Sequence, residues 1–416
     1  MFILLSLILL LFIASLLYFK KDMKNPLAFF WLIWFTILFL YIIKLFDINE
    51  IRMNTSIVIF VGISAFSGGY LLQSKVRVRG EFEQTSDTQF KRLKFLAIVT
   101  VFTSLPFYIP NIIQVLQGST LEMMKIGLVT GEVASGGIWM QFFVRPFKHI
   151  VIAVSAYCIV VKRNQRVTIL SGIILSVFDL LGSGSKTSIV YFLACIIIAY
   201  ITNKNTLLYI KKNKKILMVI AVVIIGYIIY YVGISGIYYY ICGCIPLLDQ
   251  VINNNFYLSD GFTYGFLSFN SIIRLVINFF NIFGVEIHST LFDRANKYIS
   301  RFEYTTDIGN NVNYNAMHTL FGDFYADLGI VGVITFSFVF GAFSCYVWKK
   351  YKKTKSMWSY IVYCIVIYYI VFSMVRFQMS NTYLGLMLVY SISVMRFILY
   401  GKKINIRIFE RYYAKI

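Results

Sequence analysis

The chain has little negative charge, little histidine and little proline for its length. Its 416 residues include 18 acidic residues, 3 histidines and 5 prolines, whereas lysine and arginine number 39. Charged residues make up only 14% of the sequence, and hydrophobic residues make up 59%. Because so little charge accompanies so much apolar surface, an ordinary soluble domain is excluded. The composition indicates an integral membrane protein whose main solvent is the lipid bilayer.

The shortage of metal-binding side chains argues against metal chemistry. The chain has 6 cysteines, and most of them lie inside apolar runs, where cysteine behaves as a small hydrophobe. Cys242 and Cys244 are too close together for a disulfide framework, and no metal-ligand spacing occurs. We therefore expect no metal ion and no other cofactor.

The formal net charge of +21 does not indicate nucleic-acid binding, because the basic residues lie in short clusters between apolar segments. Such clusters are typical of the cytoplasmic loops of membrane proteins. Every second loop is basic, which predicts an N-terminus outside the cell and a cytoplasmic C-terminus. The basic segments are 20–24, 73–94, 162–166, 203–215, 349–355 and the tail from Gly401.

The apolar runs predict an all-α polytopic membrane protein with about eleven spanning helices of roughly twenty residues each. The first run, from Met1 to Phe19, lacks a basic start and a small-residue cleavage site, so we interpret it as a retained helix and not as a signal peptide. The predicted spans are 1–19, 27–46, 55–72, 93–116, 143–161, 167–182, 187–202, 216–241, 319–348, 357–375 and 382–400.

Two long segments are predicted on the outer side of a single transmembrane domain that covers 1–416. Segment 117–142 has the composition of a loop with short amphipathic pieces. Segment 242–318 is too short for an ordinary independent domain and too long for a simple connection. We therefore expect it to carry short helices.

One helix of the second long segment is predicted between Ile272 and Glu286. This stretch is apolar, but Arg274, Asn278 and Asn281 share one helical face within it. The helix is either interfacial or re-entrant, with its polar stripe turned toward a cavity, or it is an amphipathic helix on the surface.

A glycine-rich block, Gly182-Ser-Gly-Ser-Lys186-Thr187, joins two apolar runs without room for a long loop. A helix that begins at Thr187 presents free N–H groups and the positive end of its dipole beside Lys186. This arrangement is typical of a phosphate-binding site. The alternative is that Lys186 extends toward water at a helix end.

An acidic block opens the predicted span from residue 319. Asp323 and Asp327 are four residues apart, so they share a helix face, and His318 precedes them. One interpretation is that the two carboxylates only offset the helix dipole. However, carboxylates in an apolar run are costly, and partial burial raises a carboxyl pKa toward that of a general base. Asp323 and Asp327 are therefore candidate bases, with His318 as a competing base.

Several cations lie at the outer ends of the predicted helices. Arg145 begins the fifth span, Arg274 lies in the second long segment, and Arg376 lies in a short outer turn. Some of these cations are solvated bystanders. Together with Lys186, they predict an anionic ligand, most simply a phosphate on a lipid carrier.

The glycine-rich block and the acidic block resemble sequence elements of a known family. The block from Gly182 to Thr187 is similar to the GS-[RK] element of the oligosaccharide repeat unit polymerases, with Gly184 as an extra residue. The block from Gly322 to Gly329, which contains Tyr325, is similar to the G-x-x-Y-x-D-[FL]-G element of the same Wzy-type O-antigen and capsule polymerases. The length and the number of predicted spans also agree with that family.

The resemblance implies a GT-C-like membrane glycosyltransferase of the bacterial cytoplasmic (inner) membrane. Its substrates would be undecaprenyl-diphosphate-linked oligosaccharides, and a chain-length regulator and a flippase are expected partners besides the bilayer. In this interpretation Arg145, Lys186, Arg274 and Arg376 bind the diphosphates, and Asn278 lies on the same face as Arg274. Tyr325 would lie near the sugars. The alternatives are a ligase that transfers finished O-antigen and a flippase or transporter of lipid-linked oligosaccharide.

Overall fold

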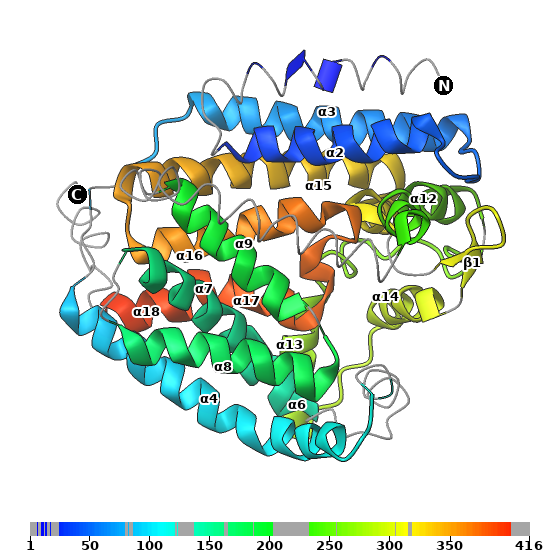
Figure 1. Ribbon diagram of the computed structural model, residues 1–416. Helices are drawn as coiled ribbons and strands as arrows, with labels where there is room; N and C mark the ends of the chain where they lie inside the picture. The colour runs from blue at the N-terminus through cyan, green and yellow to red at the C-terminus, as the bar shows by residue number, and fades with distance from the viewer. Residues whose placement is uncertain are drawn as a thin grey trace. The chain divides into compact units, whose positions relative to one another are not determined.

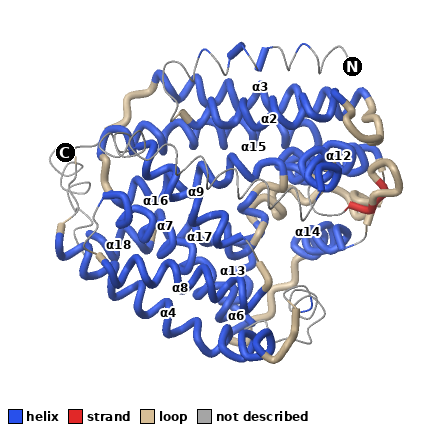
Figure 2. Tube along the Cα trace, viewed as in Figure 1, coloured by secondary structure: helices blue, strands red, loops and turns tan. Residues whose placement is uncertain are grey.

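The computed structural model describes most of the chain. The described residues are 25–79, 82, 86–120, 123, 137–161, 165–185, 187–202, 233–254, 256–303, 305–314 and 318–400, with six positions between 6 and 17. They are almost entirely helical, and the exception is a short antiparallel pair of strands, β1 (Thr306–Asp307) and β2 (Asn313–Tyr314) (Figure 2).

The protein is an all-α polytopic membrane protein. Its described residues contain 8 helices that are long and apolar enough to cross a bilayer. They are α2 (Pro26–Ile43), α3 (Met53–Lys75), α4 (Asp87–Leu116), α6 to α7 (Gly137–Val160), α8 (Arg166–Ser183), α15 (Thr319–Thr354), α16 with η3 (Met357–Met374) and α17 with α18 (Thr382–Tyr400).

These helices confirm eight of the predicted spans. The predicted span 187–202 is a shorter apolar helix, α9 (Thr187–Thr202). The predicted span 1–19 and residues 216–232 of another lie outside the described residues, apart from a few positions near the N-terminus. In segment 117–142, residues 124–136 also lie outside them, and helix begins already at Gly137.

Helix boundaries follow local signals in the sequence. Asn25 caps α2, because its side chain accepts a hydrogen bond from the Leu27 N–H at 3.0 Å, and Pro26 occupies the first turn. At α4, Ser86 and Gln89 form a reciprocal capping box.

The chain groups into two compact units. The first comprises Met1–Arg79, Asn205–Lys350 and Val366–Gly385. In it, α2, α3 and α15 pack together (Figure 1), and Phe30 stacks on Phe66 with ring centroids 3.8 Å apart. Helices α3 and α15 approach so closely that a side chain at Gly69 or Gly341 would clash with a backbone carbonyl of the other helix.

The second long segment, 242–318, belongs to the first unit and carries short helices, as predicted. They are α12 (Cys244–Asn253), α13 (Asn270–Ile282), α14 (Thr290–Ser300) and η2 (Arg301–Glu303). Asp249 of α12 accepts hydrogen bonds from the Arg52 N–H at 2.8 Å and the Thr55 hydroxyl at 2.6 Å, so it caps α3 from a distant part of the chain.

The second unit comprises Gly80–Lys204, Tyr351–Ile365 and Leu386–Ile416. Helices α4, α7 (Arg145–Val161), α8 and α9 pack against one another in it (Figure 1). Helix α18 (Val394–Tyr400) packs on α4, where the Arg92 guanidinium donates to the Ile398 carbonyl at 2.9 Å.

Candidate active site

The start of α15 has a strained backbone. Thr319 has a φ of 66°, an unfavourable conformation for a β-branched residue. The N–H groups of His318 and Thr319 both donate to the Val375 carbonyl, at 3.0 and 3.2 Å. Such strain costs about 1–3 kcal/mol and persists only where the surroundings enforce it, which is common at functional sites.

His318 and Asp323 form a buried pair. Nε2 of His318 lies 2.6 Å from Oδ1 of Asp323, and both side chains are at most 2% exposed. The second carboxylate oxygen of Asp323 accepts hydrogen bonds from the Phe377 N–H at 2.8 Å and the Ser380 hydroxyl at 3.0 Å. Asp323 is therefore fixed by residues 377–380 and in turn fixes the imidazole of His318.

The other ring nitrogen of His318 is available. Nδ1 is buried and has no hydrogen-bond partner among the described residues. Because Nε2 faces a carboxylate, the proton of a neutral ring resides on Nε2, and Nδ1 keeps its lone pair. Burial lowers the pKa of His318 below its usual value of 6.5, although Asp323 opposes this effect. A neutral imidazole held by a carboxylate is the arrangement of a general base.

Aromatic rings enclose this imidazole. Phe302 stacks on His318 with centroids 3.9 Å apart, and Tyr298 meets it edge-on at 5.7 Å. Tyr298 is 1% exposed, and its hydroxyl has no hydrogen-bond partner within the described part of the chain. Burial raises the pKa of Tyr298 well above its usual value of 10.0, so the hydroxyl remains protonated.

Arg376 supplies positive charge beside the pair. It is half-buried, and its guanidinium makes no hydrogen bond or ion pair with the residues that the structure describes. Its charge reaches both neighbouring rings, since it lowers the pKa of His318 and opposes the rise in the pKa of Tyr298. A half-buried arginine whose guanidinium has no described partner can bind an anion that approaches His318.

Asp327 has different partners from Asp323. Its carboxylate is buried and accepts hydrogen bonds from the Thr263 hydroxyl at 2.5 Å and from the N–H groups of Gly265, Leu267 and Ser268 at 2.8, 3.2 and 3.0 Å. Asp327 belongs to α15. Its carboxylate therefore holds the loop that precedes α13 against α15.

The helix breaks directly after Asp327. Gly329 has a φ of 61° and a ψ of −145°, which favours glycine, and α15 is kinked there. Tyr325 packs edge-on against Phe262 at 6.5 Å. The acidic block thus forms a short initial helix, a kink and then the long membrane helix.

The predicted helix in the long segment is α13. The Arg274 guanidinium donates to the Asn296 side chain of α14 at 2.6 Å and lies over the Phe292 ring. Burial lowers the pKa of Arg274. Asn278 donates to the Arg274 carbonyl at 2.8 Å, and Asn281 is exposed. Arg274 therefore links α13 to α14, and Asn278 stabilises α13. The Arg274 Nε–H is buried and has no partner among the described residues.

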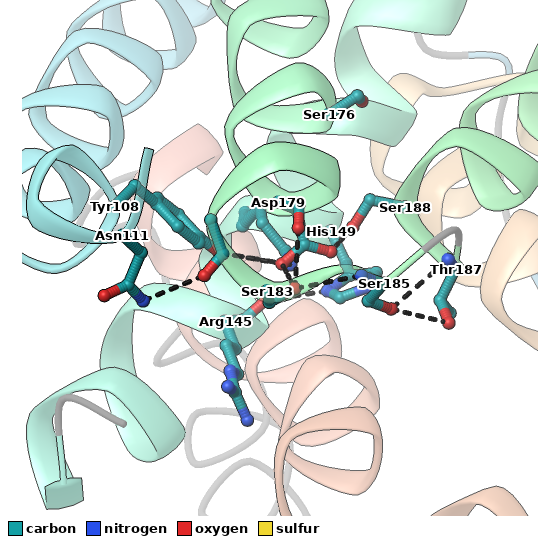
Figure 3. Close-up of polar contacts among 12 residues, drawn as sticks. Tyr108, Asn111, Arg145, His149, Ser176, Asp179, Ser183, Ser185, Thr187 and Ser188 are labelled. Atoms are coloured by element: carbon teal, nitrogen blue, oxygen red, sulfur yellow. Dashed lines mark hydrogen bonds and ion pairs between the residues drawn. The ribbon is translucent and has the colours of Figure 1, made fainter. Parts of the chain in front are cut away.

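The second unit contains a separate buried ion pair (Figure 3). The Lys148 ammonium of α7 lies 2.6 Å from Oδ1 of Asp179 in α8, and both are almost fully buried. The Tyr108 hydroxyl donates to Oδ1 at 2.9 Å, and the Ser188 hydroxyl of α9 donates to Oδ2 at 2.5 Å. Asp179 therefore joins α4, α7, α8 and α9.

The glycine-rich block is built around this ion pair. Gly184 adopts the left-handed conformation that ends α8, and α9 begins at Thr187, as predicted. The Ser185 hydroxyl accepts a hydrogen bond from the Thr187 N–H at 3.3 Å. Lys186 lies outside the described residues. Figure 3 shows the Arg145 side chain directed away from Asp179.

The structure thus brings only some of the candidate residues together. His318, Asp323 and Arg376 are neighbours, whereas Asp327 and Tyr325 lie further along α15 and Arg145 belongs to the second unit. Sequence reasoning missed Tyr298 as a neighbour of His318 and Lys148 as the partner of Asp179. Opposite charges in two apolar runs were a usable signal for the ion pair, but Tyr298 had none.

No family model, curated protein or solved structure gives a significant match.

Proposed function

We propose that the chain is a GT-C-like glycosyltransferase that polymerises oligosaccharide repeat units carried on undecaprenyl diphosphate. The growing glycan passes to a sugar hydroxyl of the incoming lipid-linked unit, as in O-antigen or capsule synthesis. The observation that carries the proposal is the buried His318–Asp323 pair, whose Nδ1 has no partner among the described residues and whose His318 pKa is lowered by the charge of Arg376.

In the proposed chemistry, His318 and Arg376 have different roles. Nδ1 of His318 takes the proton of the acceptor hydroxyl while the hydroxyl oxygen bonds to the anomeric carbon of the donor glycan. The bond from that carbon to the diphosphate breaks, and its electron pair leaves with undecaprenyl diphosphate. Asp323 stabilises the imidazolium that forms, and Arg376 stabilises the diphosphate.

The other predicted residues take supporting roles in this proposal. Asp327 positions the loop before α13, since donors from that loop already occupy its carboxylate. Arg274, with Asn278 on its face, assists at the diphosphate of one substrate. Arg145 and Lys186 serve the second lipid-linked substrate, and Tyr325 lies on the glycan side.

The proposal includes a location and partners. The basic loops support an enzyme of the bacterial inner membrane with its N-terminus outside and segment 242–318 at the outer face. Polyprenyl tails lie among the apolar helices. A flippase supplies the lipid-linked units, and a chain-length regulator limits the product.

Complementation of a strain that lacks its own copy of this protein tests the proposal. We expect His318→Gln to lower polymer formation by about 10²–10⁴-fold at a normal membrane level of the protein, because the general base is lost. His288→Gln is the matched control, because that side chain is 87% exposed, and it should retain the full polysaccharide ladder. A normal ladder from His318→Gln would refute the assignment.

An O-antigen ligase uses the same lipid donor, and the same experiment separates the two activities. A strain without the ligase still makes long lipid-linked chains, whereas a strain without the polymerase accumulates single repeat units. A flippase is less well supported, because the candidate diphosphate-binding cations are predicted at the outer ends of helices and not along a path through the membrane.

A further inference from the structure

Tyr298 has a buried hydroxyl that the proposed chemistry does not yet use. Among other buried tyrosines of the first unit, the Tyr369 hydroxyl donates to the Leu384 carbonyl at 2.6 Å, and the Tyr257 hydroxyl lies 2.7 Å from that of Thr306. The Tyr238 hydroxyl lacks a partner among the described residues, as the Tyr298 hydroxyl does, but no histidine ring contact accompanies it. Burial of a hydroxyl without a partner is unfavourable and calls for an explanation. The Tyr298 hydroxyl lacks a partner among the described residues, and so does Nδ1 of the adjacent His318.

The two groups together have the hydrogen-bonding pattern of an alcohol. Nδ1 of His318 offers a lone pair and requires a donor, whereas the protonated Tyr298 hydroxyl can donate. An alcohol satisfies both, because its O–H donates to Nδ1 and its oxygen accepts from Tyr298. An ionised phosphate has no proton for Nδ1 and suits the neighbouring Arg376 instead.

We propose that Tyr298 and His318 form the subsite for the acceptor sugar hydroxyl, with Tyr298 donating a hydrogen bond to the oxygen that attacks. This inference rests on the proposed function and adds a second catalytic residue to it. Tyr298 keeps its own proton throughout, and the acceptor proton passes to Nδ1 as the new glycosidic bond forms. Phe302, stacked on His318, fixes the plane of the imidazole.

Both side chains are nearly fully buried, so a sugar can reach them only by displacing part of what covers them. Tyr298 is 1% and His318 is 2% exposed. Tyr298 belongs to α14, which contacts the body of the unit through the Arg274–Asn296 hydrogen bond. A shift of α14 therefore accompanies entry of the acceptor.

The variant Tyr298→Phe distinguishes the proposed catalytic role of the Tyr298 hydroxyl from a structural role. The variant removes a hydroxyl that has no partner among the described residues, so we expect its melting temperature in detergent to be unchanged or higher. With lipid-linked repeat units extracted from the deficient strain, we expect the polymerisation rate to fall about tenfold or more, the value of one good hydrogen bond to the reacting oxygen. Tyr369→Phe is the control, because it removes a hydroxyl that has a protein partner. We expect this variant to have a lower melting temperature and a normal polymerisation rate per folded molecule.

The outcomes are distinguishable. A normal rate for Tyr298→Phe, with His318→Gln inactive, would overturn the subsite and leave the proposed function in place. A lower rate together with a lower melting temperature would assign Tyr298 to structure, which also overturns the inference. Normal activity of His318→Gln would remove the proposed function itself.

Discussion

His318 owes its position to the backbone as much as to its side-chain partner. The Val375 carbonyl holds the N–H groups of both His318 and Thr319, and the φ of 66° at Thr319 turns the chain into α15. Since Phe377 and Ser380 hold Asp323, residues 375–380 support both members of the pair. One short segment therefore sets the geometry of the base, and Arg376 lies within it.

The pH dependence of the reaction follows from the pKa of His318. Burial lowers this pKa below 6.5, so the neutral base persists to lower pH than for an ordinary histidine. We expect the acid limb of kcat/KM to have its midpoint below pH 6.5. Arg376→Gln removes a positive charge that lowers the same pKa, so the midpoint should move to higher pH, besides a loss of rate.

This prediction is checked by pH–rate profiles of the purified enzyme in liposomes with extracted lipid-linked units. Arg294→Gln, in α14, serves as the control for loss of one arginine elsewhere in the first unit. An acid limb that stays in place or moves to lower pH in Arg376→Gln would contradict the electrostatic link between Arg376 and His318.

At the residue scale, the sequence indicated His318, Asp323 and Arg376 as candidates but not how they are arranged. His318 was a candidate only because it precedes the acidic block. Its contact with Asp323 depends on the unusual φ of Thr319, which local preferences disfavour. Asp323 and Asp327 were equal candidates for the base because of their helical spacing. Spacing does not specify which distant loop supplies the hydrogen-bond donors to each carboxylate.

At the scale of elements, buried carboxylates join helices to other parts of the chain. Asp249 caps α3, Asp327 binds the loop before α13, and Asp179 joins α8 to its neighbours. Each accepts several hydrogen bonds, as a buried carboxylate requires. These contacts explain why a chain with so few acidic residues places several of them inside apolar surroundings.

The Lys148–Asp179 pair leads to a stability prediction. Lys148→Met leaves a buried carboxylate without its cation, and we expect a loss of about 3–5 kcal/mol in the free energy of unfolding. The double variant Lys148→Met, Asp179→Asn removes both charges and should regain most of this loss. Thermal unfolding in detergent is the measurement.

The matched control for this prediction is Lys44→Met, which breaks the exposed pair of Lys44 with Glu50 and should change stability little. If the double variant were as unstable as Lys148→Met alone, desolvation of the unpaired carboxylate would not be the cause of the loss.

Helix boundaries were more predictable than helix contacts. The glycine-rich block marks the junction of α8 and α9, as the sequence predicted, and α2 begins at Pro26, one residue before the predicted span 27–46. By contrast, nothing local pairs Lys148 with Asp179, because the rotation of each helix within a bundle depends on packing.

At the scale of the whole molecule, the apolar composition is explained by 8 described helices that can cross a bilayer. Segment 242–318 lies between membrane helices in the sequence and contributes Tyr298 of α14 and Phe302 of η2 to the surroundings of His318. In the proposed function, this segment covers an outward-facing site where two lipid-linked substrates meet. The proposed function requires no soluble nucleotide-sugar domain, because in it the glycan arrives already activated on its lipid.

The most direct test is an electron cryomicroscopy map of the protein in nanodiscs with undecaprenyl diphosphate. The account predicts density for the diphosphate in contact with the Arg376 guanidinium, with the free terminal phosphate, from which the glycan has left, directed toward His318. Diphosphate density remote from both Arg376 and His318, with the Arg376 side chain unengaged, would contradict it.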